Sequence, residues 1–382
     1  MGEQDSLQPG DAPTARDGVT SAGMHGATAV GRSAADDRRH RHKILVGGLL
    51  GALAVTAVSA VFILCFIGGL HDPGPRGVPI GLVGTPAQAS RVGAALGSQK
   101  PGAFNIHSYP SVAAARNGIS NRSIDAILVL STTSMQHLLV ASAVSEAETN
   151  TIIKVFHAGA AKAHVRLAVQ DIRPLNTGDP QGLSMLFFVV ALTAPSLVFG
   201  NLLINRIGTK LNELWHLAMI TVYSVIVATV ATAIADAGIG ALTGAPWAIF
   251  GVGVLLAFAA AVMGAAAVRW GGRLAYVVIL LLFVPAGISS SGSTLGPHMI
   301  TPWWADLGRA LPPGAAQSTV RNVTYFNGNA TTDQLLVLSA WALAGVLALV
   351  LAFLLHPPIP GQSNQPAQPD AVASSSPVAA TE

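Results

Sequence analysis

Long uncharged stretches of apolar residues dominate this sequence and limit what the chain can fold into. Such runs occur at residues 44–70, 182–204, 214–235, 246–268, 274–288 and 334–355. A helix needs about 20 apolar residues to cross the hydrocarbon layer of a bilayer, and each run exceeds or approaches that length. Only 10% of the residues are charged, whereas a soluble protein carries about 25%, so lipid must solvate much of the chain. The sequence therefore predicts an α-helical polytopic membrane protein with six transmembrane helices.

The two ends of the chain differ in composition from these runs. Residues 1–43 are rich in Gly, Ala, Asp, Ser and Thr, and residues 357–382 are rich in Pro, Gln and Ser. Neither segment can bury enough apolar surface to offset the entropy of ordering, so both are predicted to be disordered tails. The 44–70 run is interpreted as an uncleaved first transmembrane helix, because a long tail precedes it and no small-residue cleavage site follows.

Basic residues are unevenly distributed among the short connections between the runs. One side of the membrane would carry eight of them: Arg38, Arg39, Arg41, Lys43, Arg206, Lys210, Arg269 and Arg273. The opposite short connections carry only Arg309 and Arg321. Because cytoplasmic loops carry the excess of Lys and Arg, both termini are predicted to be cytoplasmic.

Residues 71–181 have ordinary charge content and are predicted to form an extracytoplasmic α/β domain between the first and second transmembrane helices. Strand-like and helical segments alternate there, at 78–83, 86–97, 104–109, 112–118 and 124–130. This alternation favours a parallel, right-handed layer, with Thr85 and Pro86 as the N-cap and first turn of its first helix. Further along, 137–143 fits a strand or a helix, 146–164 a helix, and 165–172 a closing strand.

No motif of catalysis or ligand binding stands out. Cys65 is the single cysteine, so a disulfide framework and a cysteine metal site are excluded. Nucleophile elbows, Walker loops and dinucleotide glycine motifs are missing from the sequence, and a net charge of +3 gives no support to nucleic-acid binding. The acidic and imidazole side chains of 71–181 lack metal-ligand spacing and are expected to be solvated or capping: Glu146, Glu148, His137, His157 and His164. The sequence thus predicts no catalytic, cofactor-binding or metal-binding residue, no cofactor, and a protein that is not an enzyme.

The apolar runs themselves carry information about energy coupling. None has an Asp, Glu, Lys or Arg near its middle, although ion-coupled transporters keep ionisable groups at that depth. Any energy used should therefore come from another subunit.

The connection 289–333, within the 182–356 transmembrane domain, is predicted to contain an interfacial helix. Trp303, Trp304, Leu307 and Leu311 recur at helical spacing, while Asp306 and Arg309 point elsewhere. Paired tryptophans on a short amphipathic helix suit the headgroup layer of a bilayer. Two alternatives remain open for this segment: a lid that satisfies the loop, or a re-entrant element that lines an exit.

Several of these segments follow a recognisable pattern across residues 44–356. They are the strand 79–83, the segments 111–118 and 124–129, the Ser-Ser-Ser-Gly stretch at 289–292, the 304–314 block, Arg321, and 325–328. In them the chain resembles ABC-2 type transporter permeases, specifically the bacterial YhgE/Pip-like and DUF3533-like membrane proteins. The acidic residue often found after the first strand in that group is replaced here by Gly84 and Thr85.

The resemblance implies a permease subunit in the bacterial plasma (inner) membrane that exports an unidentified substrate. Such subunits pair in the lipid bilayer as homo- or heterodimers and couple to a cytoplasmic ABC ATPase, here supplied in trans. The alternative is a non-transport envelope membrane protein whose extracytoplasmic domain binds a ligand or partner.

Overall fold

The computed structural model describes residues 22–131, 135–207 and 212–355. Five helical stretches in these residues are long and apolar enough to cross a membrane: Arg39–Gly68, Ser184–Arg206, Glu213–Gly238, Pro246–Ser290 and Thr332–Leu355. This is the composition of a multi-pass helical membrane protein. Residues 1–60 and 61–382 are separate compact units, and each is considered by itself.

Helix α1 (Ala22–Ile63) begins well before residue 44, where the first apolar run starts. Residues 22–43 contain no proline, and adding residues to an existing helix costs less than nucleating a new one. Part of the predicted N-terminal tail is therefore helical. The rest of that tail, and all of the predicted tail 357–382, lie outside the described residues. A π-helical turn (Leu64–Gly68) follows α1.

The second unit contains a five-stranded sheet with strand order β2-β1-β3-β4-β5. Its strands are β1 (Val78–Val83), β2 (Phe104–Tyr109), β3 (Ala126–Val129), β4 (Met135–Val140) and β5 (Arg166–Asp171). Strand β1 pairs in parallel with β2 and β3, as the alternation of elements predicts, and β4 pairs in parallel with β5. Strands β3 and β4 are antiparallel, because the few residues between them cannot hold a crossover helix.

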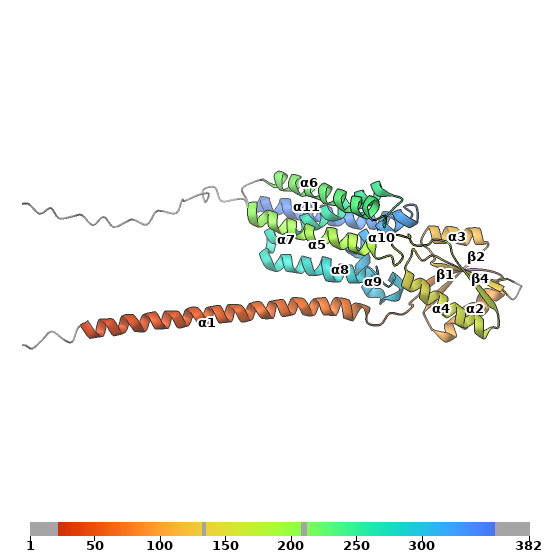
Figure 1. Cartoon of the computed structure of the whole chain (residues 1–382), viewed down its shortest axis with the longest axis horizontal. Helices are drawn as coiled ribbons and strands as arrows, with labels where there is room; N and C mark the ends of the chain where they lie inside the picture. The colour runs from red at the N-terminus through yellow and green to blue at the C-terminus, as the bar shows by residue number, and fades with distance from the viewer. Residues whose placement is uncertain (1–21, 132–134, 208–211, 356–382) are drawn as a thin grey trace, which may run out of the picture. The chain divides into compact units, whose positions relative to one another are not determined.

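Three helices cover the two faces of this sheet: α2 (Pro86–Gln99), α3 (Val112–Ser120) and α4 (Glu146–Lys162). Helices α2 and α4 cover one face and α3 covers the other (Figure 1). Ile80 and Leu128 pack with residues of α2 and α4, whereas Ile127 packs with residues of α3. Helix α2 starts as predicted, with the Thr85 side chain accepting from the Gln88 amide in a capping box. We call residues 72–181 the α/β region.

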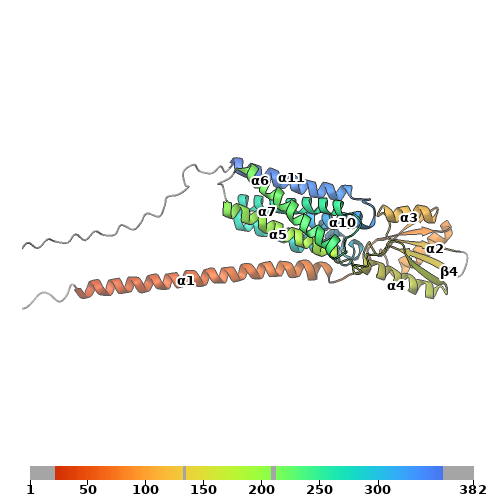
Figure 2. The same cartoon turned by 45° about the horizontal axis from the view of Figure 1, so that its top comes forward.

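Four long helices lie side by side in both views (Figure 1, Figure 2): α5 (Ser184–Ile207), α6 (Glu213–Ala233), α7 (Pro246–Leu281) and α11 (Thr332–Leu355). Small residues allow α5 and α7 to approach closely. A Cβ at Gly264 would lie only 2.7 Å from the Leu197 carbonyl oxygen, and one at Gly200 would collide with the Ala261 carbonyl. Close contact of this kind favours helix association in lipid, where the hydrophobic effect gives no drive.

The stretch Pro246–Ser290 is not one straight helix. Gly271 and Gly272 have non-helical backbone angles, and Gly272 has a φ of 59°, which glycine adopts without steric cost. Leu274 and Val278 line one pocket together with Met263, so the chain doubles back at the two glycines. The break falls between the 246–268 and 274–288 runs. A π-helical turn (Leu282–Ala286) and the short α8 (Gly287–Ser290) complete this stretch.

The connection after α8 is packed more deeply than a surface loop. It contains a 3-10 turn (Pro297–Met299), α9 (Pro302–Ala310) and α10 (Pro312–Tyr325). Ala316 and Val320 of α10 belong to the same core as Phe188 of α5 and Leu256 of α7. Helix α10 is therefore buried among the long helices, while the choice between a lid and a re-entrant element stays open.

Helix α9 separates the two tryptophans that were predicted to share a face. Trp303 is 66% exposed, whereas Trp304 is 7% exposed and packs near Cys65. Adjacent residues on a helix are about 100° apart, so one side of α9 cannot present both rings. Trp303 is thus the exposed member of the pair, next to the exposed ion pair of Asp306 and Arg309, and the interfacial position of the helix stays a prediction.

Candidate functional site

Three ionisable side chains from distant parts of the sequence converge where the α/β region meets the connection after α8. Asp125 immediately precedes β3, Glu148 lies in the first turn of α4, and His298 lies in the turn Pro297–Met299. The Nδ1 atom of His298 is 3.0 Å from an Asp125 carboxylate oxygen and 3.3 Å from a Glu148 carboxylate oxygen. We call Asp125, Glu148 and His298 the acid–histidine cluster.

Local structure brings both carboxylates to the same place. The side chain of Ser145 caps α4 by accepting from the Glu148 amide at 3.3 Å, and a carboxylate in the first turn of a helix is favoured by the helix dipole. The Asp125 amide donates to the Pro79 carbonyl at 2.9 Å, which fixes Asp125 beside β1. Both carboxylate side chains are almost fully buried, at 3% and 1% exposed, while the imidazole is 35% exposed.

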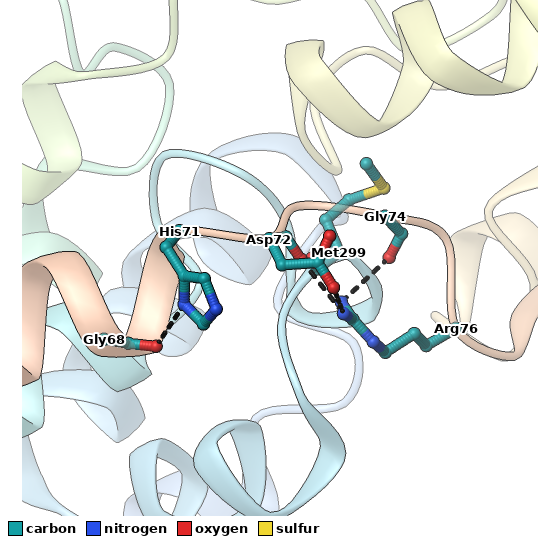
Figure 3. A network of polar contacts seen from close by, with 6 residues as sticks. All are labelled: Gly68, His71, Asp72, Gly74, Arg76 and Met299. Carbon is teal, nitrogen blue, oxygen red and sulfur yellow. Dashed lines mark hydrogen bonds and ion pairs between the residues drawn. The ribbon is translucent and has the colours of Figure 1, made fainter.

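The turn that carries His298 is held by the chain segment that follows α1. The Arg76 amide donates to the His298 carbonyl at 2.9 Å, and the Gly74 amide donates to the Met299 carbonyl at 3.1 Å. The Arg76 guanidinium also donates to the Met299 carbonyl and to the Asp72 carboxylate (Figure 3). These contacts order the turn independently of its imidazole.

Gly296 allows this turn to lie directly over the carboxylates. Its φ is +95°, and a Cβ at this position would collide with the Glu148 carboxylate. A residue with a side chain would be strained by the backbone angle and would push the turn away from α4. Glycine is therefore required here for the acid–histidine cluster to close.

The charges in the cluster are strongly coupled. Burial raises the pKa of Glu148 to about 7, and the neighbouring negative charge of Asp125 adds to this. Burial opposes the charged form of His298, but hydrogen bonds to Asp125 and Glu148 outweigh it and raise its pKa to about 10. Burial likewise opposes ionisation of Asp125, yet bonding to His298 and the Arg122 charge hold its pKa below the usual value. Near neutral pH the imidazole is therefore a cation held by the ionised Asp125, while Glu148 exchanges a proton in this range.

A pocket of about 310 Å³ has His298 in its lining, whereas Asp125 and Glu148 are not among its lining residues. Five basic side chains line it: Arg76, Arg122, His298, Arg309 and Arg321. Among the described residues that line this pocket there is no Asp or Glu. We call it the basic pocket, because all the charged side chains in its lining are basic.

Arg321 is the most unusual member of the basic pocket. The residue is 4% exposed, and its contact with the Ser293 carbonyl is long, at 3.5 Å. Its Nε atom is buried without a hydrogen-bond partner, and none of the described carboxylates lies within ion-pair distance of it. Burial and the neighbouring Arg122 lower the pKa of Arg321 to about 10, so the group remains charged at neutral pH.

The acid–histidine cluster contains the atom types of a metal centre, since its three ligand atoms lie within 4.8 Å of one another. The surrounding charges oppose a cation, however. Arg122 lies 3.7 Å from Asp125, and the imidazole nitrogen that faces both carboxylates holds a proton that a metal would have to displace. The arrangement is better suited to holding a proton and presenting positive charge to the basic pocket.

The sequence did not identify this site. Glu148 was expected to be solvated or capping, and this was wrong, because its side chain is buried against Asp125 and His298. His137, His157 and His164 are exposed as expected, and Glu146 is partly exposed. The pattern Ser145-x-x-Glu148 marks a helix start, but no local signal pointed to a partner for Glu148 about 150 residues away.

The structure combines a mixed five-stranded sheet, a helix that doubles back at Gly271–Gly272, and the basic pocket. No family model, no curated protein and no solved structure matches this chain.

Proposed function

We propose that this chain is the membrane permease subunit of an ABC-2 type export system, with its ATPase supplied in trans. The observation that carries the proposal is the placement of charge in the five apolar helical stretches. Their Asp, Glu, Lys and Arg residues lie at helix ends or at the Gly271–Gly272 break. Ion-coupled transporters generally keep charged residues at mid-membrane, so the lack of a central Asp, Glu, Lys or Arg in these described stretches favours an energy source outside the chain.

The resemblance to ABC-2 type permeases adds support. It rests on the segments around Arg321 and 304–314, which in the structure form α9, α10 and part of the basic pocket. A permease of this kind pairs with a second membrane subunit and with a cytoplasmic ATPase. The chain would then export an unidentified substrate across the plasma membrane.

Coupling to an ATPase has a direct test. The full chain, purified in mild detergent from its own membranes, should carry an ABC-type ATPase, and ATP hydrolysis by that partner should depend on the chain. Export by the reconstituted complex should continue when ion gradients are collapsed and ATP is maintained. Export that stops on uncoupling at constant ATP would contradict the proposal.

We also propose six crossings with both termini in the cytoplasm. A straight helix of 45 residues would be about 68 Å long, roughly twice the hydrocarbon thickness. The break at Gly271–Gly272 supports counting Pro246–Ser290 as two crossings. The excess of basic residues at 38–43, 206–210 and 269–273 supports the cytoplasmic orientation.

Single cysteines in a Cys65→Ser background test this topology. Exposed positions Ser98 and Thr294 should react with a membrane-impermeant maleimide in intact cells, whereas Gly271 should react only after permeabilisation. Thr294 is the informative site, since a single crossing by Pro246–Ser290 would place it in the cytoplasm. Protection of Thr294 in intact cells would exclude six crossings.

A second candidate function is ligand binding by the α/β region without transport. One observation favours it: a pocket of about 270 Å³ between α2 and α4, lined mainly by apolar side chains such as Leu96, Leu128 and Phe156. An apolar lining of this kind suits a small apolar ligand. The ATPase experiment separates the two functions, because this candidate requires no nucleotide-hydrolysing partner.

A further inference from the structure

We propose that the basic pocket is a binding site for a phosphate group, with Arg321 as its central ligand-binding residue. The proposal concerns binding alone and does not depend on the proposed export function. Phosphate fits because the guanidinium group offers several donors in a planar fork that matches phosphate oxygens.

The buried charge of Arg321 is the first argument. An isolated charge removed from water is costly unless it is paired, and among the described residues the hydrogen-bond contact of the Arg321 side chain is the long one with Ser293. Arg321 lines the pocket, and its buried Nε has no described hydrogen-bond partner. An anion in the pocket would supply the missing partner and would offset this cost.

The charge of the whole lining is the second argument. Arg122 is occupied on one side by Asp125 and by the ring of Phe326, 4.7 Å from its guanidinium carbon, and Arg76 and Arg309 are paired with Asp72 and Asp306. These partners hold the basic side chains in place at the rim, whereas Arg321 lies buried deeper in the wall. Because the other basic side chains each have a carboxylate partner, Arg321 is the lining cation for which an anion in the cavity would supply the missing counter-charge.

The position of the pocket allows two sources for the phosphate. Gln334, near the start of α11, lines the pocket, and Trp303 on the neighbouring α9 is 66% exposed, as suits the headgroup level of a bilayer. The phosphate of a lipid headgroup could therefore reach the site, and so could a soluble phosphate.

The first experiment uses the full chain in a detergent that contains no phosphate, titrated with inorganic phosphate by calorimetry. Sulfate-free chloride buffer at constant ionic strength controls for screening. We expect the wild type to bind phosphate saturably. The affinity should be about tenfold or more weaker in Arg321→Gln, which loses charged hydrogen bonds to the phosphate. Arg166→Gln, at an exposed position on β5, should bind like the wild type.

Phosphatidic acid in phosphatidylcholine nanodiscs provides the lipid arm, read as the rise in the thermal midpoint that a bound ligand produces. The site would be assigned to a lipid headgroup if phosphatidic acid raises the thermal midpoint of the wild type but not of Arg321→Gln, and calorimetry detects no binding of inorganic phosphate. Arg321-dependent binding of inorganic phosphate would assign it to a soluble phosphate. Either result supports the proposal.

A second variant covers the case in which Arg321→Gln fails to fold. Ser318 is partly buried, lines the pocket and lies one turn before Arg321 on α10, so Ser318→Glu would place a carboxylate next to the guanidinium. This variant should fold and should lose binding of both probes. The proposal is overturned if neither probe binds the wild type or if both variants bind like the wild type.

Discussion

His298→Ala is expected to lower the thermal midpoint of the full chain by about 5 °C at pH 7. The imidazole is the cation that faces the buried carboxyl groups of Asp125 and Glu148, and removing one partner of a buried ion pair costs roughly 3 kcal/mol or more. For a protein of this size that loss moves the midpoint by several degrees. The measurement is unfolding followed by intrinsic fluorescence in detergent.

His157→Ala is the matched control, because this histidine is on the exposed side of α4 and its removal should leave the midpoint unchanged. The double variant His298→Ala with Glu148→Gln should recover part of the loss, because one buried carboxylate no longer needs a cation. Equal midpoints for His298→Ala and His157→Ala would show that the acid–histidine cluster contributes nothing to stability.

Stability is expected to fall as pH rises from about 5 to 10. Glu148 has a pKa of about 7 in the folded chain against 4.5 as its ordinary value, so the folded state retains a proton that the unfolded chain has released. His298 changes in the same direction, from 6.5 to about 10, and its stabilisation is complete below 6.5 and lost as pH rises through 10. Asp125, whose pKa is lowered, contributes stability that disappears only in stronger acid.

Variants separate the two steps of this profile. Glu148→Gln should remove the decline between about pH 5 and 7, and His298→Gln should remove the decline between about pH 7 and 10, both measured as thermal midpoints across a buffer series. Glu146→Gln, two residues from Glu148 and partly exposed, is the control and should keep the wild-type profile. A wild-type midpoint that rises with pH across this range would contradict the assigned directions.

Most secondary structure could be predicted because local patterns determine it. Strand β1 has the predicted bounds, and Thr85 with Pro86 begins α2 as predicted. The break at Gly271–Gly272 also falls where the apolar runs separate. Helix α10 was not predicted, because its buried face includes Gln317, Thr319 and Arg321, and such polar residues lack the apolar periodicity of an amphipathic helix.

The sequence by itself determined that the chain needs lipid and that a strand-and-helix segment interrupts its apolar helices, since composition and periodicity are properties of neighbouring residues. Only the tertiary structure decided the site. No local motif marks Asp125, Glu148 or His298 in the sequence. Their pKa values shift because the fold buries them against one another. Likewise, Arg321 was one of two basic residues in the 289–333 connection of the sequence, and only the fold shows that its Nε is buried without a described hydrogen-bond partner. Contacts between residues far apart in the chain produce no periodic pattern in the sequence, so they could not be predicted from local patterns.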